Sequence, residues 1–209
     1  AKVNQKTMGR RKFRAEEVFD GYMMHRNKVL VTTNDGEIEA LISEDEAGED
    51  VQKVEGILTP GFINAHCHLE LSHLKEVIPP HTGLIEFLCS VVTKRNFSAE
   101  VIHDAIVRAE EEMYQNGIVA VGDIGNTADT AAVKNMSRIQ WQNFVEVLSF
   151  SDENAEQQIN HYSGVAKALI EKCAQSISRT RTSIVPHAPY SIDRKSTRLN
   201  SSHTVISYA

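Results

Sequence analysis

The pattern of apolar and polar positions changes in character near residue 58. Before it, short β-prone runs alternate with turn residues, and KVLVTT and EIEALIS flank the sequence Asn34-Asp35-Gly36. Glycine accepts the positive φ that hairpin turns require, so this stretch predicts an antiparallel hairpin. FRAEEVF predicts a further strand before it. We therefore expect residues 1–58 to form part of a small β-sandwich domain with a disordered start.

After residue 58, apolar strands alternate with amphipathic helices. Helices are predicted at 82–95, 98–116, 127–136 and 153–174. Ser98 can cap the second of them and Gly117 can end it. One stripe of this helix is apolar and comprises Val101, Ile102, Ala105, Ile106, Ala109 and Met113.

The strands between these helices are continuous apolar runs, namely ILTPGFINAH, IVAVGDI, WQNFVEVLSF and SIVPHAPYSI. Alternation of this kind predicts an α/β fold in which helices cover a parallel sheet. A barrel and an open doubly wound sheet both satisfy the pattern. An eight-unit barrel needs about 250 residues, so the alternating part of this chain is about half of one.

Composition narrows the cellular setting. The longest apolar runs are too short to span a membrane, and the basic start has no apolar region behind it, so neither a transmembrane helix nor a secretory signal is predicted. Three cysteines without CxxC spacing favour reduced thiols. The net charge of −6 gives no support to a nucleic-acid partner. We expect a cytoplasmic protein that binds neither nucleic acid nor membrane.

The two ends of the chain differ from the rest. Residues 193–209 crowd serine and threonine without periodicity and resemble the translation of a short-read sequencing adapter, which predicts a non-native tail. At the other end Ala1 is not a methionine, and the sequence from Met8 is more typical of a natural start. These features predict a fragment of a gene, and they give His203 in the tail no functional meaning.

His66 and His68 are the strongest candidates for chemistry. They end an apolar strand and are separated by one residue, so in an extended strand they point to the same side. Neutral imidazole is the commonest protein ligand for zinc, at about 2.0–2.1 Å. The pair therefore predicts half of a metal site. Cys67 between them should face the opposite side and pack in the core.

Other polar residues near the ends of the predicted strands leave several roles open. Glu70 could orient a metal ligand, contact substrate, or be an exposed loop carboxylate. Asp123 follows an apolar strand and is either a second layer of the site or, by preference, the cap of the next helix. His73 and His81 are expected to be ordinary loop histidines.

The blocks LTPGFINAHCHLELSH and IVPHAPYSI resemble the amidohydrolase superfamily, in particular its branch of cytosine deaminases, chlorohydrolases and S-adenosylhomocysteine or aminofutalosine deaminases. The resemblance covers about residues 12–192. It implies a partial TIM (β/α)8 barrel, with the first four strand–helix units in residues 59–192. It also implies a hydrolase of non-peptide C–N bonds, in which metal-activated water attacks a carbon of an N-heterocyclic amine.

The resemblance also implies roles for individual residues. His66 and His68 would be metal ligands, and His187 matches a position that contacts substrate, which we favour over a third ligand. Glu70 is assigned to substrate binding as well. The segment 177–192 has no lysine to bridge two ions, so one divalent ion is expected, zinc in preference to iron. The proton-shuttling glutamate would lie beyond this chain, so no catalytic residue is assigned within it.

Two other functions fit parts of the sequence. HCHLEL is similar to the HxHxDH ligand motif of metallo-β-lactamase-fold hydrolases, but glutamate and leucine replace two ligands. A non-catalytic assembly protein on the amidohydrolase fold is the second alternative, and a structural descendant would not need two metal ligands. We therefore expect an enzyme with a small-molecule substrate, of which this incomplete chain alone is inactive, and the sequence leaves the oligomeric state open.

Overall fold

The computed structural model describes residues 9–186 and 191–196, and the chain divides into two compact units after Pro60. His187 lies outside the described residues, as does the part of the predicted tail from residue 197 onward. Each unit has its own sheets and its own buried residues, and each is considered by itself below.

The first unit consists of two small sheets, ordered β5-β4-β1-β6 and β3-β2-β7. Val18, Val29 and Val31 are its most buried large side chains. The strands are β1 Arg10–Arg14, β2 Glu17–Phe19, β3 Met24–His25, β4 Lys28–Thr33, β5 Ile38–Ser43, β6 Val51–Lys53 and β7 Ile57–Leu58, with a 3-10 turn η1 at Glu44–Glu46.

The predicted hairpin is confirmed as the antiparallel pair β4 and β5. Gly36 has a φ of 88°, and the Thr33 N–H donates a hydrogen bond to the Glu37 carbonyl at 2.8 Å. The single strand expected from FRAEEVF is wrong. The chain turns at buried Ala15, so that β1 and β2 on either side of it belong to different sheets.

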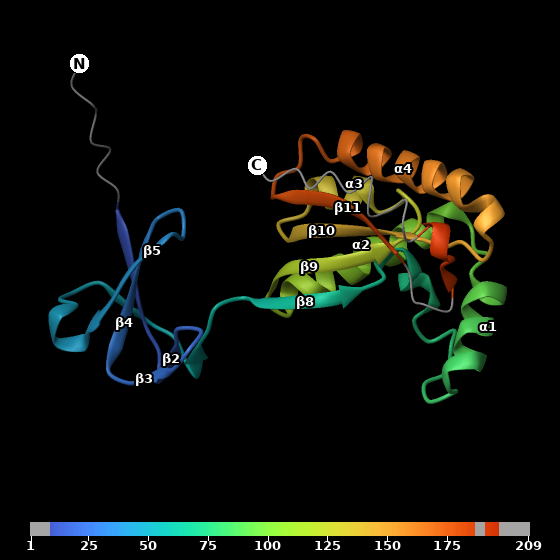
Figure 1. Ribbon diagram of the computed structural model, residues 1–209. Coiled ribbons are helices and arrows are strands. Elements are labelled where there is room, and N and C mark those ends of the chain that lie inside the picture. Colours follow the sequence, from blue (N-terminus) through green and yellow to red (C-terminus); the bar gives the residue numbers. More distant parts are fainter. Residues whose placement is uncertain (1–8, 187–190, 197–209) are drawn as a thin grey trace, which may run out of the picture. The chain divides into compact units, whose positions relative to one another are not determined.

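The second unit is built on four parallel strands in the order β11-β10-β9-β8 (Figure 1). Their bounds are β8 Phe62–Cys67, β9 Ile118–Gly125, β10 Gln140–Val147 and β11 Thr180–Pro186. The predicted parallel sheet is thus confirmed. β11 begins three residues earlier than SIVPHAPYSI suggested, because Thr180 to Thr182 continue the pairing with β10 although they are polar.

Helices connect these strands much as the sequence predicted, with bounds α1 Leu84–Lys94, α2 Ala99–Gln115, α3 Ala131–Met136 and α4 Ala155–Lys172, and short 3-10 segments η2 Leu69–Leu74 and η3 Asp152–Asn154. Ser98 caps α2 by accepting the Val101 N–H at 3.4 Å. Gly117, with a φ of 78°, follows its end. Val101 itself is 44% exposed, so the buried stripe begins at Ile102. None of the helices in the described residues is long and apolar enough to cross a lipid bilayer.

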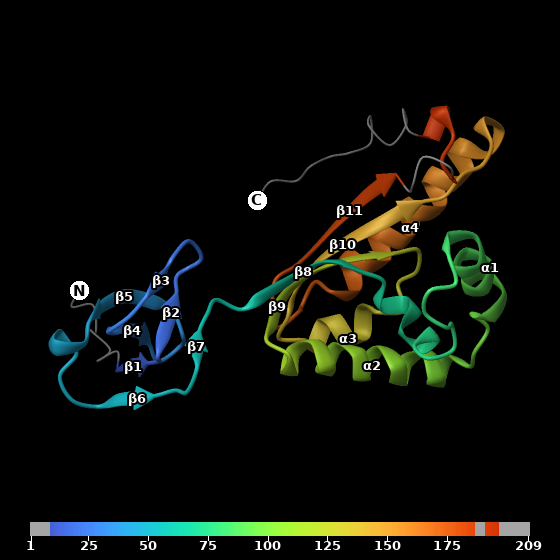
Figure 2. The same cartoon turned by 90° about the horizontal axis from the view of Figure 1, so that it is seen from below.

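The sheet has one face covered by helices and one that is not packed against α2, α3 or α4. On β10, Trp141, Val145 and Val147 are buried, while the alternate residues Phe144 and Glu146 are only partly covered. Figure 2 shows α2 and α3 along one side of the sheet. Two buried clusters lie on that side: Leu69, Ile106, Val121, Ile139 and Trp141 in one, and Ala131, Val145, Val147, Ile159, Tyr162, Ala166, Leu169 and Cys173 in the other.

Candidate metal centre at the end of β8

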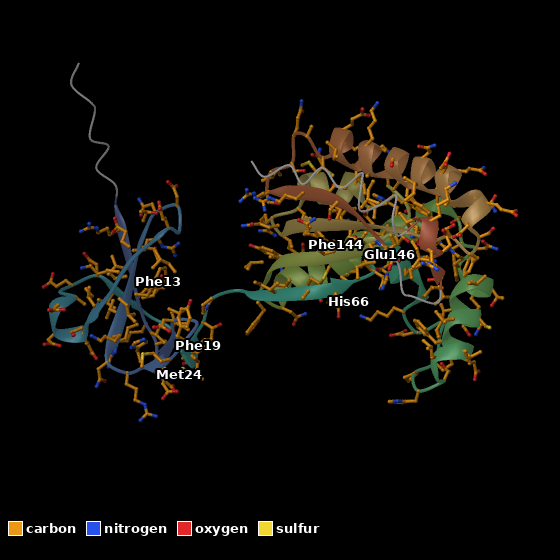
Figure 3. The ribbon with its side chains drawn as sticks, viewed as in Figure 1. Phe13, Phe19, Met24, His66, Phe144 and Glu146 are labelled. Carbon is orange, nitrogen blue, oxygen red and sulfur yellow. The ribbon has the colours of Figure 1, made fainter. Side chains whose placement is uncertain are left out.

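The two predicted metal ligands converge at the carboxyl end of β8. The Nε2 atoms of His66 and His68 lie 3.2 Å apart, and both side chains are exposed (Figure 3 labels His66). Two nitrogens bound to one tetrahedral zinc at about 2.0–2.1 Å would be about 3.3 Å apart. The observed separation therefore fits two ligands of a single ion.

The histidine pair supplies two of the four ligands that a tetrahedral zinc site needs. Across residues 9–186 and 191–196, no group of three or more His, Cys, Asp and Glu side chains is placed to hold a metal. Any further ligands must therefore come from elsewhere.

The surroundings of His68 favour its neutral form. Burial lowers the pKa of the imidazole, and the neighbouring His66 lowers it further. A metal binds neutral imidazole, so a histidine with a lowered pKa loses less affinity to competing protons near neutral pH.

A β-bulge between Asn64 and Cys67 includes His66. Asn64 pairs with Val121 and Cys67 pairs with Asp123, so β8 uses one residue more than β9 over this stretch. Asn64 contacts the Met113 sulfur on α2 at 3.8 Å, and Cys67 packs against the cluster below α2. Residues three apart therefore face the same helix layer, which strict alternation would forbid.

Gly122 on β9 lies against this bulge. A Cβ atom there would be 2.8 Å from the backbone oxygen of Ala65 and 3.2 Å from the Phe144 ring. The close approach of β8 and β9 therefore requires a residue without a side chain at this position.

Cys67 has the packing role that its position predicted. It contacts the buried cluster on the helix-covered face, away from the two imidazoles. Burial, followed by the nearby Asp123 carboxylate, raises the pKa of its thiol to about 12. The thiol stays protonated at neutral pH and is a poor nucleophile.

Glu70 is buried, with 7% of its surface exposed, so the exposed-loop alternative is wrong. Its carboxylate accepts the N–H groups of Asn126 and Thr127 at 2.9–3.1 Å and the Thr127 hydroxyl at 2.8 Å. Glu70 thereby ties η2 to the loop after β9. Contact between Glu70 and a substrate stays a prediction.

Asp123 does not cap the helix that follows it, and that preference is wrong. It lies within β9, and its Oδ1 atom accepts the N–H of Leu69 at 2.8 Å, at the start of η2. Its Oδ2 atom forms an ion pair with Lys134 from α3. Lys134 could not be singled out beforehand, because AAVKNM is also typical of a solvent-exposed helix turn.

Glu146 is a second residue that the sequence analysis missed. It lies near the carboxyl end of β10, on the face that bears Phe144 (Figure 3). Burial, together with the negative charge of Glu70, raises its pKa to about 7. The available signal was one carboxylate within the apolar run FVEVL, close to a strand end where barrel enzymes place chemistry.

His73 and His81, which were both predicted to be loop histidines, differ in burial. His81 is exposed, in agreement with a loop position. His73 is buried in η2 with its ring edge against Phe97, at 5.3 Å between centroids, so its description as an ordinary loop histidine is wrong.

Comparison with known proteins adds a family match. A family model described as the amidohydrolase family matches residues 57–195, which include the β8 histidines and all four parallel strands. No curated protein matches the chain.

Solved structures share the fold. Helicobacter pylori aminofutalosine deaminase in complex with methylthio-coformycin superposes with a TM-score of 0.69 and 22% identity, over 91% of this chain and 47% of that one. Guanine deaminase from C. acetobutylicum with bound guanine superposes with a TM-score of 0.67 and 15% identity, over 90% of this chain and 48% of that one. An adenosine deaminase from Xanthomonas campestris with bound zinc superposes with a TM-score of 0.60 and 19% identity, over 87% of this chain and 44% of that one. The chain thus has a fold related to the TIM barrel and spans about half the length of these structures.

Proposed function

This chain belongs to the amidohydrolase family, and from that premise we propose that it carries the first two metal ligands of a metal-dependent hydrolase acting on non-peptide C–N bonds. The observation that supports this most directly is the 3.2 Å separation of the His66 and His68 Nε2 atoms at the carboxyl end of a parallel strand. Barrel enzymes place their chemistry at that end of the strands.

The architecture proposed for this function is the first half of a barrel. The four strands β8 to β11 would be the first four of eight, preceded by the small β unit. The missing ligands and the proton-shuttling carboxylate would come from the second half. By this proposal the chain alone is inactive, because two ligands do not complete a catalytic site.

The proposed cofactor is one divalent ion, with zinc preferred and iron as the alternative. A metal in this place supplies a Lewis acid and lowers the pKa of water from 15.7 to about 7. His66 and His68 would hold it through their Nε2 atoms, and the lowered pKa of the partly buried His68 ring favours the neutral form that binds metal. Glu70 and Asp123 hold the backbone on which these ligands stand.

The proposed substrate is a small N-heterocyclic amine. Three proteins with the same fold are deaminases by name, and one of them was solved with guanine bound. We assign substrate contacts to His187, on the segment after β11, and keep Glu70 as a second candidate. Glu146 lies on the face of β10 that bears Phe144 and is a further polar group that a substrate could meet. Three free cysteines suit the proposed cytoplasmic setting.

Membership of the amidohydrolase family removes the support for a metallo-β-lactamase-fold enzyme. The convergence of two imidazoles favours an enzyme over an assembly protein on the same fold. A purely structural role would not require nitrogens at zinc-ligand spacing.

A metal-binding measurement tests the proposal. Zinc affinity is determined by competition with a chromophoric chelator for the wild-type chain, the variant His66→Ala/His68→Ala, and the control His103→Ala, which removes an exposed histidine on α2. We expect the double variant to bind zinc at least tenfold more weakly and the control to match wild type. The full-length protein should release ammonia from purine bases or nucleosides. Equal zinc affinity in all three chains would refute the assigned ligands.

A further inference from the structure

Asp123 contacts the residues on both sides of His68. Its Oδ1 atom accepts the Leu69 N–H at 2.8 Å, and Asp123 lies opposite Cys67 in the pairing of β8 with β9. Asp123 is only 4% exposed. A buried carboxylate thus holds position 69 from the neighbouring strand, while the His68 ring points to the open side.

The chain leaves the strand conformation at His68. Its φ of −123° and ψ of 73° match neither a strand nor a helix, and the chain changes from β8 to η2 at this residue. The peptide between His68 and Leu69 carries the N–H that Asp123 accepts. This hydrogen bond therefore restrains ψ of His68, the torsion that sets the direction of the chain after the imidazole-bearing residue.

Lys134 balances the charge of Asp123. It is 1% exposed, forms an ion pair with Asp123 Oδ2, and donates to Asn143 Oδ1 at 2.6 Å. Asn143 in turn donates to the Thr182 hydroxyl at 3.1 Å. The polar chain thus runs from η2 through β9, α3 and β10 to β11, within the layer between sheet and helices.

A buried ion pair of this kind is not explained by stability. Well-packed apolar residues of similar volume are often as stable or more stable than a buried pair, because both charges must be removed from water. What an apolar replacement would not supply is an acceptor for the Leu69 N–H. Through Asp123 the pair reaches the backbone that carries a candidate metal ligand.

We propose that Asp123, with its charge balanced by Lys134, is a positioning residue that fixes the backbone and ring of His68 for metal binding. This inference rests on the proposed function, since it assumes that His68 is a ligand. Asp123 acts through the Leu69 N–H, and it does not touch the metal or the substrate itself.

Two matched variants of the full chain test the proposal. Asp123→Asn/Lys134→Met removes both buried charges but keeps an amide oxygen for Leu69, whereas Asp123→Leu/Lys134→Met removes the acceptor as well. Loss of an outer contact to a ligand typically weakens metal binding by about 10–100-fold. We expect that loss of zinc affinity in the leucine variant and a value within about threefold of wild type in the asparagine variant.

The readouts separate positioning from stability. Equal zinc affinity of the two double variants, whether both are unchanged or both weakened, would overturn the proposal. NMR of the metal-free chains gives a second readout that does not depend on zinc: the His68 ring signals should shift in the leucine variant and stay in place in the asparagine variant. If wild type binds no zinc, the proposed function fails while this readout still decides the positioning role.

Amide exchange covers the case in which the leucine variant does not fold. In the wild-type chain the Leu69 N–H should exchange slowly with solvent, because it is buried and bonded to Asp123. Rapid exchange of the Leu69 N–H, while the amides of β9 stay protected, would contradict the proposal without any variant. The replacement Asp123→Ala/Lys134→Met, which introduces no larger side chain, then repeats the zinc comparison.

Discussion

The two faces of the β8–β11 sheet differ in what they bury. The face toward the helices holds Trp141, Val145 and Val147 among apolar neighbours, and also the Asp123–Lys134 pair with all its polar partners nearby. The other face carries Phe144, Glu146 and the open side of the histidine pair, with much of this surface exposed or half-buried.

The difference shows how one strand serves two purposes. Because side chains alternate along β10, neighbouring positions belong to different environments. Residues 141, 143, 145 and 147 are buried on the face that packs against the helices. Residues 142, 144 and 146 lie on the opposite face. Stability and candidate chemistry are thus encoded in alternate positions of the same segment.

Truncation of one aromatic residue on each face gives the largest expected contrast. Trp141→Ala should lower the free energy of unfolding by about 4 kcal/mol, since the removed ring is buried against Ile106 and Leu69. Phe144→Ala, on the half-buried face, should lower it by only about 1 kcal/mol. Urea denaturation of both variants measures the difference. Similar losses for the two would show that the faces do not differ as described.

Removal of one partner of the buried ion pair should have the next largest effect. Lys134→Met leaves the Asp123 carboxylate buried without its counter-charge and should lower the free energy of unfolding by about 3 kcal/mol. The double variant with Asp123→Asn should regain most of that loss. Chemical denaturation of the single and double variants checks this, and a double variant as unstable as the single one would argue against charge balance as the reason for Lys134.

The smallest expected effect is the pH dependence from Glu146. Its pKa in the folded chain is raised from 4.5 to about 7, so the folded state holds the proton more tightly than the unfolded state. Stability from this group is present below pH 4.5 and is lost as the pH rises through 7. Glu146→Gln should flatten that decline, and melting temperatures of both chains between pH 5 and pH 8 measure it. If the melting temperature of the variant fell with pH as steeply as that of wild type, a group other than Glu146 would cause the pH dependence.

Local sequence patterns predicted much of this fold. The hairpin around Gly36, the capped helix α2 and the alternation of strands with helices all depend on neighbouring residues, and each was confirmed. The spacing of His66 and His68 also pointed to their convergence, although the bulge at His66 and the end of β8 at Cys67 depart from the regular strand on which that prediction relied.

The residues that escaped prediction depend on contacts between distant segments. Asp123 was expected to cap its own following helix, yet its partner is Leu69, 54 positions earlier in the chain. Lys134 resembles a surface lysine until α3 is packed on β9. The bulge between Asn64 and Cys67 has no signature in PGFINAHCH, because both sides of it are apolar or small. Pairing across strands, which a single sequence does not display, decides all three.

Gly122 has a consequence for how this protein can change over evolutionary time. The bulged strand that carries the two imidazoles lies so close to β9 that a methyl group at position 122 would meet backbone rather than a movable side chain. Surface loops around the site can accept insertions and new residues, but this position has no such latitude. We therefore expect related sequences to differ around the candidate site and to keep the spacing of β8 against β9 constant.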